Sequence, residues 1–437
     1  MNEDKTMKSM SELKYHFGLK MQAYPTKKQR RIINLNINVQ RRVYNCMVAL
    51  DREIYDIKHV KGVYIRQDMI RLPDLEKQRK RQSYFANAHP WLYNKKIDSN
   101  AVSQAKRNYR TAWKNYRTVP TAQMPHFKKW GYDGSYQTSA IYNKNPMSPF
   151  VASVRFIDLK TVKLPKVGKV AVCGSQERIL KDKTDIKIGT TTVKRDNCGD
   201  YYISMQLGSD TPFVKELPPV DFDHQELGID LNTRNFLETS DGLMIDNPHF
   251  LLKSIKRLRK EMRVLSRRQL VAQKQHKPLR EAKNYQKQRK VVAKIYRHLT
   301  NQRKDFINNV AAYLTKNYGM VAAEDLKSRT MLGKSHKLNQ AIYEVSWYAF
   351  LQRMTTNAEL YNRQFVKVNP ANTTQMCSNC GHVMGEDGTS KLHFGKDNPR
   401  KIWVCPKCGA KHESDWNAAI NILARAKLML EDDKATA

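Results

Sequence analysis

Apolar and polar residues alternate near the start of the chain, a pattern typical of a β-strand with one buried face. The apolar positions are Leu13, Tyr15, Phe17, Leu19 and Met21. After Tyr24 the apolar residues recur at helical spacing, and Thr26 with Gln29 forms a capping box, a common start of a helix. Residues 98–117 repeat the helical pattern strongly. We therefore expect a strand followed by a helical segment over residues 26–117.

The pattern changes after about residue 118, where short alternating runs are separated by Gly, Asn and Asp. The sequence RDNCGD at residues 195–200 has the composition of a hairpin turn between two such runs. These features predict an antiparallel β-barrel formed by residues 1–25 and 118–220, into which the helical segment is inserted. The Pro-rich stretch LPPVDFDHQ places a domain boundary near residues 218–226.

An aspartate stands in the middle of the next predicted strand. Leu227, Ile229 and Leu231 alternate with Gly228 and Asp230, and a Ser-Asp-Gly turn follows. The pattern predicts the first strand of a hairpin with one buried face. A carboxylate in such a strand must be desolvated, neutralised or bound to a cation, so Asp230 is a candidate functional residue.

The next segment is helical and very basic. Residues 251–305 contain 19 Lys and Arg against 3 Asp and Glu, and KPLREAKN interrupts the helical pattern. Two interpretations remain open: a pair of helices with a solvated charged face, or a helical hairpin that contacts phosphates.

The whole chain is basic as well. Its 437 residues include 78 Lys and Arg against 41 Asp and Glu, a formal charge of +37 that calls for a polyanionic partner. Nucleic acid is the leading candidate and an anionic membrane is its rival. No apolar run approaches the ~20 residues of a membrane span, and the polar N-terminus has no signal-peptide core. We expect a cytoplasmic protein with reduced thiols and no membrane partner.

Two further carboxylates lie where ligands are often bound. Glu324 ends a short buried strand within residues 318–327, and Asp415 lies in the first turn of a helix that starts near Glu413. The alternatives are an acidic cap on the next helix for Glu324 and simple helix capping for Asp415. Together with Asp230 they could converge and hold two Mg²⁺ ions, which prefer carboxylate oxygens.

Other acids nearby have simpler interpretations. Asp241 and Asp246 are expected in turns, and Asp325 should point away from Glu324 because neighbouring strand residues alternate faces.

Four of the seven cysteines form two C-x-x-C pairs, each followed by glycine. Cys377 and Cys380 are separated by 24 residues from Cys405 and Cys408. Four thiolates make a closed tetrahedral zinc site, which is structural because no position is left for substrate. The alternatives are a pair of redox dithiols or vestigial knuckles. The neighbouring histidines are surplus and are expected at the surface; they are His382, His393 and His412.

Several aromatic residues could stack on nucleobases, although core packing is the simpler interpretation of each one. They are Trp113, Trp130, Tyr136, Trp347 and Trp403.

Motifs from about residue 24 to residue 425 carry a resemblance to a known family. They are YPTKKQ, RRVYNCMV, PHFKK, KLPKVGKV, GIDLN, LTNQRKDF, AAEDLKSRTM, NPANTTQMCSNCGH, CPKCG and DWNAAINIL. In these stretches the chain resembles the TnpB family of transposon-encoded RNA-guided nucleases and, through it, the compact type V CRISPR effectors. It departs from the family at Asn232 (often Gly), at Ser414 (often Arg) and at Thr356-Asn357 (usually Tyr-Lys).

The resemblance implies a multidomain α+β fold. Residues 1–25 and 118–220 would form the β-barrel (wedge) domain, with a helical recognition lobe at 26–117. A RuvC/RNase H-like α/β nuclease domain would comprise 226–369 and 413–430, interrupted by a zinc-ribbon module at 370–412. Residues 431–437 would be a disordered tail. The resemblance also assigns the magnesium ligands to Asp230, Glu324 and Asp415, and the zinc ion to the four paired cysteines.

The implied function is RNA-guided cleavage of DNA. A guide RNA would pair with one strand of a double-stranded target, and the protein would read only a short flanking motif. Two catalytic Mg²⁺ ions, one structural Zn²⁺ ion and the guide RNA are the expected cofactors, in a monomer of prokaryotic cytoplasm that associates with the nucleoid. The alternatives are a guide-dependent repressor with little cleavage and a transposase that acts directly on DNA.

Overall fold

The computed structural model describes residues 8–61, 66–142, 148–181, 185–214, 217–220, 225–326, 336–394, 398 and 401–436. The chain forms two compact units, residues 1–213 and 214–437, and each is described here by itself. Every helix in the described part of the chain is too short or too polar to span a lipid bilayer.

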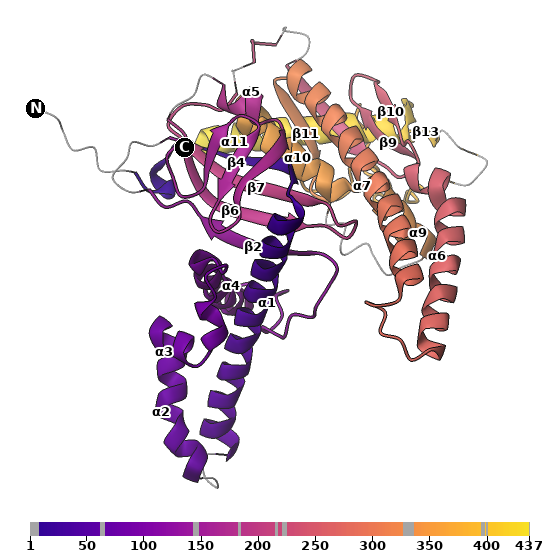
Figure 1. The fold of residues 1–437 in the computed structure, drawn as a ribbon. Helices are drawn as coiled ribbons and strands as arrows, with labels where there is room; N and C mark the ends of the chain where they lie inside the picture. The colour runs from indigo at the N-terminus through magenta and orange to yellow at the C-terminus, as the bar shows by residue number, and fades with distance from the viewer. Residues whose placement is uncertain are drawn as a thin grey trace, which may run out of the picture. The chain divides into compact units, whose positions relative to one another are not determined.

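The first unit contains a curled antiparallel sheet of seven strands (Figure 1). The strand order is β2-β6-β7-β1-β5-β4-β3, so the N-terminal strand lies in the centre and pairs with β7 and β5. Its inward-facing residues, such as Leu19 and Met21, form one core with Ile203 and Leu207 of β7. The strands are β1 (Tyr15–Tyr24), β2 (Gly134–Ser139), β3 (Arg155–Asp158), β4 (Thr161–Leu164), β5 (Gly168–Gly174), β6 (Lys187–Arg195) and β7 (Tyr201–Ser209).

The predicted strand near the N-terminus and the hairpin turn at residues 195–200 are confirmed. Asp196 accepts hydrogen bonds from the backbone N–H groups of Cys198 and Asp200, at 2.9 and 2.8 Å, which holds the turn between β6 and β7. The closed barrel stays a prediction. In the described residues β2 and β3 are the edge strands of the sheet and are not paired with each other, as closure would require.

Helices follow β1 and precede β2. The predicted capping box is confirmed, since the Thr26 hydroxyl accepts from the Gln29 N–H and the Gln29 side chain accepts from the Thr26 N–H. Asp98 caps the last helix by accepting from the Asn100 N–H at 3.0 Å. The longer helices are α1 (Lys27–Asp56), α2 (Arg66–Lys80), α3 (Gln82–Asn87) and α4 (Ser99–Thr118), and α1 and α4 share an apolar core.

The second unit is built on a mixed five-stranded sheet. Its order is β10-β9-β8-β11-β12; β8, β9 and β10 are antiparallel neighbours, whereas β8, β11 and β12 run parallel. The strands are β8 (Glu226–Leu231), β9 (Asn235–Thr239), β10 (Met244–Asp246), β11 (Met320–Glu324) and β12 (Gln364–Val368). The helices are α6 (Phe250–Lys274), α7 (Lys283–Asn317), α9 (His336–Val345), α10 (Trp347–Tyr361) and α11 (Ser414–Thr436).

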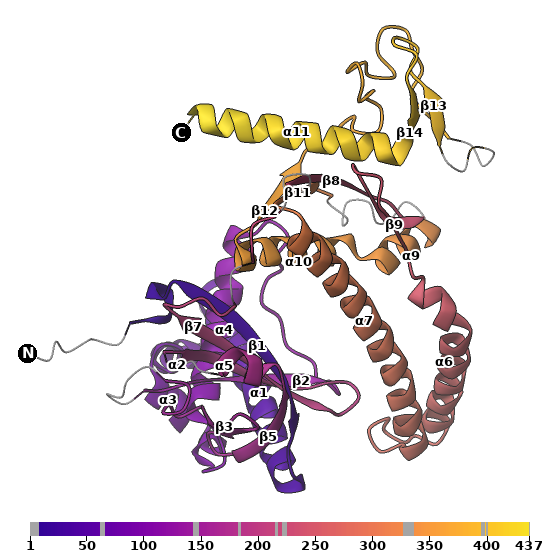
Figure 2. The same ribbon diagram turned by 90° about the horizontal axis from the view of Figure 1, so that it is seen from above.

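The two faces of this sheet are covered by different helices, as Figure 2 shows. Leu227, Ile229 and Val321 pack with apolar residues of α7, α9 and α10. Ala322 on the opposite face packs against Ile422 of α11. Because side chains alternate along a strand, Gly228 and Asp230 share the α11 face with Ala322 and Glu324.

Gly228 allows α11 to lie directly on β8. A Cβ atom at Gly228 would overlap the carbonyl oxygen of Ala419 and lie 2.9 Å from the Leu423 Cβ. Ala419, a small residue of α11, is fully buried and leaves room for this close contact.

We expect Gly228→Ala to destabilise the second unit by about 3 kcal/mol or more, because the added methyl group meets backbone that cannot move without displacing α11. Thermal unfolding followed by calorimetry would measure the loss. Gly18→Ala is the matched control, because Gly18 also lies in a strand but a Cβ there has no neighbour within 4 Å. Equal stability of the two variants would contradict this account of the packing.

Helix α11 is longer than the sequence indicated. It continues to Thr436, whereas we expected the nuclease segment to end at residue 430 and a disordered tail to occupy 431–437. The residues LEDDKAT contain neither Gly nor Pro, so nothing in their sequence stops the helix.

Candidate functional site

Two buried carboxylates lie side by side at the carboxyl ends of adjacent parallel strands. The register of β8 and β11 pairs Ile229 with Ala323, so the next residues, Asp230 and Glu324, are neighbours on the face that α11 covers. Both side chains are about nine-tenths buried. Asp325, the residue after Glu324, is exposed, as expected from strand alternation.

Asp415 comes to the same place from the first turn of α11. Its Oδ2 atom lies 3.4 Å from the Nδ2 atom of Asn232, two residues after Asp230, and its Oδ1 atom accepts from Lys401 Nζ at 2.6 Å. The three predicted acids therefore converge from β8, β11 and α11. Asn232, where the resembling family often has glycine, connects the end of β8 to Asp415.

The electrostatics of this cluster disfavour negative charge. Burial raises the pKa of Asp230 well above its usual range, and the charges of Asp415 and Glu324 raise it further, while Lys401 opposes them. Burial also raises the pKa of Glu324, although a hydrogen bond from Thr373 opposes the shift. A hard divalent cation would offset this repulsion with the ligand type it prefers, so the residues present fit Mg²⁺.

Two of the three acids form hydrogen bonds with other side chains of this protein. Thr373 donates to Glu324, and Lys401 donates to Asp415. Among the described residues, these acids are not a group of three whose ligand atoms come close enough to hold one ion. Catalytic contacts are often loose in a ligand-free protein and tighten in the complex.

A fourth carboxylate, Glu238, was not predicted. It lies directly opposite Asp230 in the β8–β9 ladder and is only 5% exposed. Burial and the charges of Glu413 and Asp415 raise the pKa of Glu238 to about 7. The Ser-Asp-Gly turn could have been used to align the two strands of the hairpin, which would have placed Glu238 beside Asp230. The sequence of the second strand alone does not show which of its faces is buried.

We expect Glu238→Gln to stabilise the metal-free protein above pH 7. Folding raises the pKa of the Glu238 carboxyl from 4.5 to about 7, so the native state binds its proton more tightly than the unfolded state does. As the pH rises from 4.5 to about 7, the free energy of unfolding therefore falls, by up to about 3 kcal/mol. Unfolding measured in Mg²⁺-free buffer at pH 5 and pH 8 should show the variant more stable than wild type mainly at pH 8. Glu359→Gln, at an exposed position of α10, is the control. A pH-independent difference would show that the Glu238 charge is not the cause.

The four paired cysteines form a second cluster. Cys377 and Cys408 have their sulfur atoms 3.7 Å apart, as do Cys380 and Cys405, and all four sulfurs lie within 4.8 Å of one another. A tetrahedron with zinc–sulfur bonds of about 2.3 Å has its sulfurs about 3.8 Å apart, so the cluster fits one Zn²⁺ ion. It is the only such metal-ligand group in the described part of the chain.

The predicted knuckles around these cysteines are present. Gly381 N–H donates to the Cys377 carbonyl and Gly409 N–H donates to the Cys405 carbonyl, both at 2.9 Å. The two glycines have φ angles of 73° and 70°, in the left-handed region where a side chain is disfavoured. A two-stranded sheet, β13 (Ile402–Val404) and β14 (Lys411–Glu413), flanks the second knuckle.

The histidines near the cysteines differ from expectation. We predicted surface positions, but His382 is buried and His412 Nε2 lies 3.0 Å from the Cys377 sulfur. His412 pairs with Trp403 across β13 and β14, and this register turns its ring toward the cluster. Only His393 is exposed as predicted.

Asparagines of α11 join the cysteine module to the sheet. Asn417 accepts from the Ser378 N–H at 2.9 Å and donates to the Met376 carbonyl at 2.7 Å. Asn421, one turn later, donates to the carbonyls of Thr373 and Met376. Because Thr373 and Lys401 also contact Glu324 and Asp415, the cysteine module helps to position two of the acids.

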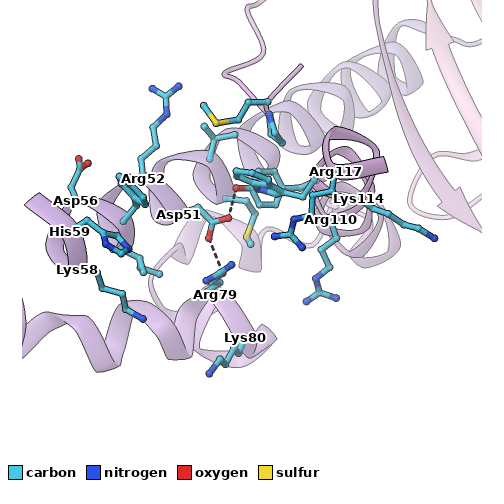
Figure 3. Close-up of a pocket in the computed structure, with 18 of the residues that line it drawn as sticks. Asp51, Arg52, Asp56, Lys58, His59, Arg79, Lys80, Arg110, Lys114 and Arg117 are labelled. Atoms are coloured by element: carbon cyan, nitrogen blue, oxygen red, sulfur yellow. Dashed lines mark hydrogen bonds and ion pairs between the residues drawn. The ribbon is translucent and has the colours of Figure 1, made fainter. Parts of the chain in front are cut away.

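A large basic pocket lies in the first unit between α1, α2 and α4. It has a volume of 1120 Å³, and Asp51 in its wall forms an ion pair with Arg79 (Figure 3) and accepts a hydrogen bond from Tyr109. Asp56 is the other acid in the lining. The lysines and arginines that line the pocket are Arg52, Lys58, Arg79, Lys80, Arg110, Lys114 and Arg117. This excess of cations suits a polyanion.

The basic segment of the second unit forms the expected pair of helices. Apolar residues at the contact between α6 and α7 make a small core, among them Leu258, Val292, Ile295 and Leu299. Many of the cations lie on the outer surfaces, for example the exposed residues Arg259, Lys260, Lys287 and Lys290. This arrangement leaves both sequence interpretations open, the solvated face and the phosphate-contacting hairpin.

Two family models match parts of the chain. The model described as "Probable transposase" (OrfB_IS605) covers residues 205–335, and "Cas12f1-like, TNB domain" covers residues 347–422. The two matches together span the sheet, the basic helices and the cysteine module. The chain is therefore similar to TnpB-like proteins and to the type V effectors.

Individual relatives agree with this family. The chain is 26% identical over 356 residues to "Putative RNA-guided DNA endonuclease InsQ" of Escherichia coli, covering 78% of this chain and 77% of that protein. It is 31% identical over 152 residues to "TnpB-like protein L79" of Acanthamoeba polyphaga mimivirus, covering 34% and 27%. A solved structure described as the Cas12f1–sgRNA–target DNA complex is similar with 15% identity and a TM-score of 0.43, covering 93% of this chain and 98% of that one.

Proposed function

We propose that this chain is an RNA-guided DNA endonuclease whose catalytic residues are Asp230, Glu324 and Asp415. The observation that carries the proposal is the convergence of two buried carboxylates, Asp230 and Glu324, with the half-buried Asp415 at the carboxyl ends of parallel strands. Relatives named as RNA-guided DNA endonucleases and as Cas12f1 support the reaction class.

Each residue of the site has a distinct task in this proposal. Asp230, Glu324 and Asp415 would hold two Mg²⁺ ions, which when bound activate water and stabilise the leaving oxygen of a phosphodiester. Thr373 fixes the Glu324 carboxylate and Asn232 orients Asp415. Lys401 keeps Asp415 neutralised until a cation replaces it, because its ammonium group lies on the Oδ1 atom.

The remaining parts of the chain would position nucleic acid. The proposed parts are the wedge domain at residues 1–25 and 118–220, the recognition lobe at 26–117 and the zinc ribbon at 370–412. The zinc ion would be held by Cys377, Cys380, Cys405 and Cys408. The basic pocket and the charge of +37 supply phosphate contacts for a guide RNA and its DNA target.

The purified protein should carry a discrete RNA species. Sequencing this RNA would give the DNA duplex that it matches. Removing the RNA with ribonuclease should abolish cleavage of that duplex, and adding the RNA back should restore cleavage. Binding should weaken steeply with salt, with a log–log slope of about −0.9 for each duplex phosphate contacted. Cleavage of defined DNA sequences by RNA-free protein would favour a transposase, and guided binding without cleavage would favour a repressor.

A further inference from the structure

A second, smaller pocket in the first unit contains hydrogen-bond donors that have no partner. It has a volume of 270 Å³ and lies where α1, α4 and β2 meet the loop at residues 125–133. Gln40, which is 8% exposed, lines it, and its Nε2 atom has no hydrogen-bond partner within the described residues. The buried Nε atom of Arg41, from the adjacent position, is likewise unpartnered there.

Such donors are unusual in a folded protein. An unsatisfied buried donor costs on the order of 1–3 kcal/mol, so a water molecule, an ion or a ligand is expected to satisfy it. The Gln40 amide cannot simply rotate to find another partner, because its Oε1 atom already accepts from the Gln137 N–H at 3.0 Å. Gln40 and Arg41 therefore bring unpartnered donors to the lining of this pocket, which suits a group that carries oxygen or nitrogen acceptors.

The loop over these donors is held at both ends. Asn45 exchanges two hydrogen bonds with the backbone of Lys128, at 2.8 and 3.0 Å. Arg195 donates to the carbonyls of Tyr132 and Gly131, at 3.0 and 3.5 Å. Trp130 lies between the two anchors and is 50% exposed.

The charge of the lining selects the ligand further. Lys129 is exposed beside Trp130, and Asp133 is the only acid in the lining. The Lys128 ammonium group lies 3.9 Å from the centre of the Tyr44 ring, so the cations that remain for a ligand include Lys129 and Arg41. Donors, cations and an exposed aromatic ring at one small cavity are the elements that bind single-stranded nucleic acid.

We propose that this pocket binds one unpaired nucleotide of a nucleic-acid strand. The base stacks on Trp130, acceptor atoms of the base or sugar face Gln40 and Arg41, and Lys129 contacts the phosphate. The volume is just below the ~300–1,000 Å³ of drug-sized ligand sites, which suits one nucleotide and not a duplex. This inference rests on the proposed function only because it takes nucleic acid as the ligand. The strand is either RNA or DNA, and the test below distinguishes the two.

The test uses the full-length protein and two 12-residue probes, oligo(U) RNA and oligo(dT) DNA, each carrying one 4-thio base and a fluorophore. Binding is followed by fluorescence anisotropy at about 0.3 M salt, where non-specific phosphate contacts weaken. Photocrosslinking followed by mass spectrometry then identifies the residue that touches the thio base. We expect a crosslinked peptide that contains Trp130, and the probe that forms it identifies the strand.

Substitutions separate stacking from hydrogen bonding. Trp130→Ala should weaken binding about tenfold and remove the crosslink, whereas Trp130→Phe should retain most of the affinity, because a ring face remains for stacking. Gln40→Glu keeps the acceptor that serves the Gln137 N–H but replaces the free donor by an anionic oxygen, so it should weaken binding about tenfold or more. Circular dichroism and thermal melting would establish that the three variants are folded.

Matched controls come from the same unit. Tyr93→Ala and Lys95→Ala alter an exposed aromatic residue and an exposed lysine that lie outside the pocket lining. Affinities of Trp130→Ala and Gln40→Glu that equal those of the controls, or a crosslink that maps elsewhere, would overturn the proposal. Failure of guided cleavage in wild type would leave these binding results intact, so the two proposals fail independently.

Discussion

Asp230→Ala should abolish DNA cleavage while leaving RNA-guided DNA binding intact. The side chain is buried beside Glu324 and Asp415, and neither the basic pocket nor the outer surfaces of α6 and α7 include it. Removing one carboxylate from a group that acts as a unit should lower the cleavage rate by about 10³-fold or more. A cleavage assay with Mg²⁺ and the RNA-loaded complex measures the rate, and a filter-binding assay measures the affinity.

The matched variant is Asp246→Ala, which removes an exposed aspartate from β10 of the same sheet. It should cleave at the wild-type rate. Glu324→Ala and Asp415→Ala should behave like Asp230→Ala, and double variants should be no worse than single ones. Full cleavage by any one of the three alanine variants would remove that residue from the proposed site.

A second measurement distinguishes a lost ligand from a disturbed fold. Burial and neighbouring charges raise the pKa of Asp230, so its negative charge destabilises the metal-free protein at neutral pH. Asp230→Asn should therefore melt at a higher temperature than wild type without Mg²⁺, and added Mg²⁺ should stabilise wild type more than the variant. A variant that is inactive but less stable than wild type would indicate a structural role instead.

Local pattern was enough to predict the elements that carry the acids. Alternation predicted β8 with Asp230 inside it, and the sequence also predicted a helix that starts near Glu413 with Asp415 in its first turn. These features depend on neighbours within a few positions, which the sequence displays directly. Burial at Tyr136, Trp347 and Trp403 likewise followed the simpler expectation of core packing.

Contacts between distant segments could not be read in the same way. Glu238 lies beside Asp230 only through the hairpin register, and Lys401 reaches Asp415 from the segment before β13. Thr373 contacts Glu324 from 49 residues away. Each of these residues looks like an ordinary polar residue in its own segment, because its role is created by packing.

The same limit applies to the free donors of Gln40 and Arg41. Helix α1 shows an amphipathic pattern that explains which of its sides is buried, but polar Gln40 lies among those buried positions. Gln40 is buried because β2 lies against it, and its Oε1 atom accepts a hydrogen bond from the Gln137 N–H of that strand. Trp130 could be named in advance as a stacking candidate, but only the structure shows that it is exposed beside those donors.

Cys377→Ser should remove zinc and unfold the cysteine module without affecting the first unit. The Cys377 sulfur is buried between Cys408 and His412, so a serine hydroxyl there loses a zinc–sulfur bond that no other side chain replaces. Structural zinc contributes on the order of 10 kcal/mol or more in small modules, comparable with the whole stability of a domain. Elemental analysis should show about one zinc ion per wild-type chain and none in the variant.

The consequences should extend from the module to the acids. The module supplies the backbone that Asn417 and Asn421 hold, the Thr373 hydroxyl on Glu324 and the Lys401 ammonium group on Asp415. Hydrogen exchange should therefore accelerate between residues 373 and 413, and the cleavage rate should fall together with the zinc content. Cys173→Ser, an exposed free cysteine of β5, is the control and should change neither quantity. Normal exchange protection and cleavage in zinc-free Cys377→Ser would show that the hydrogen bonds to α11 hold the module without the ion.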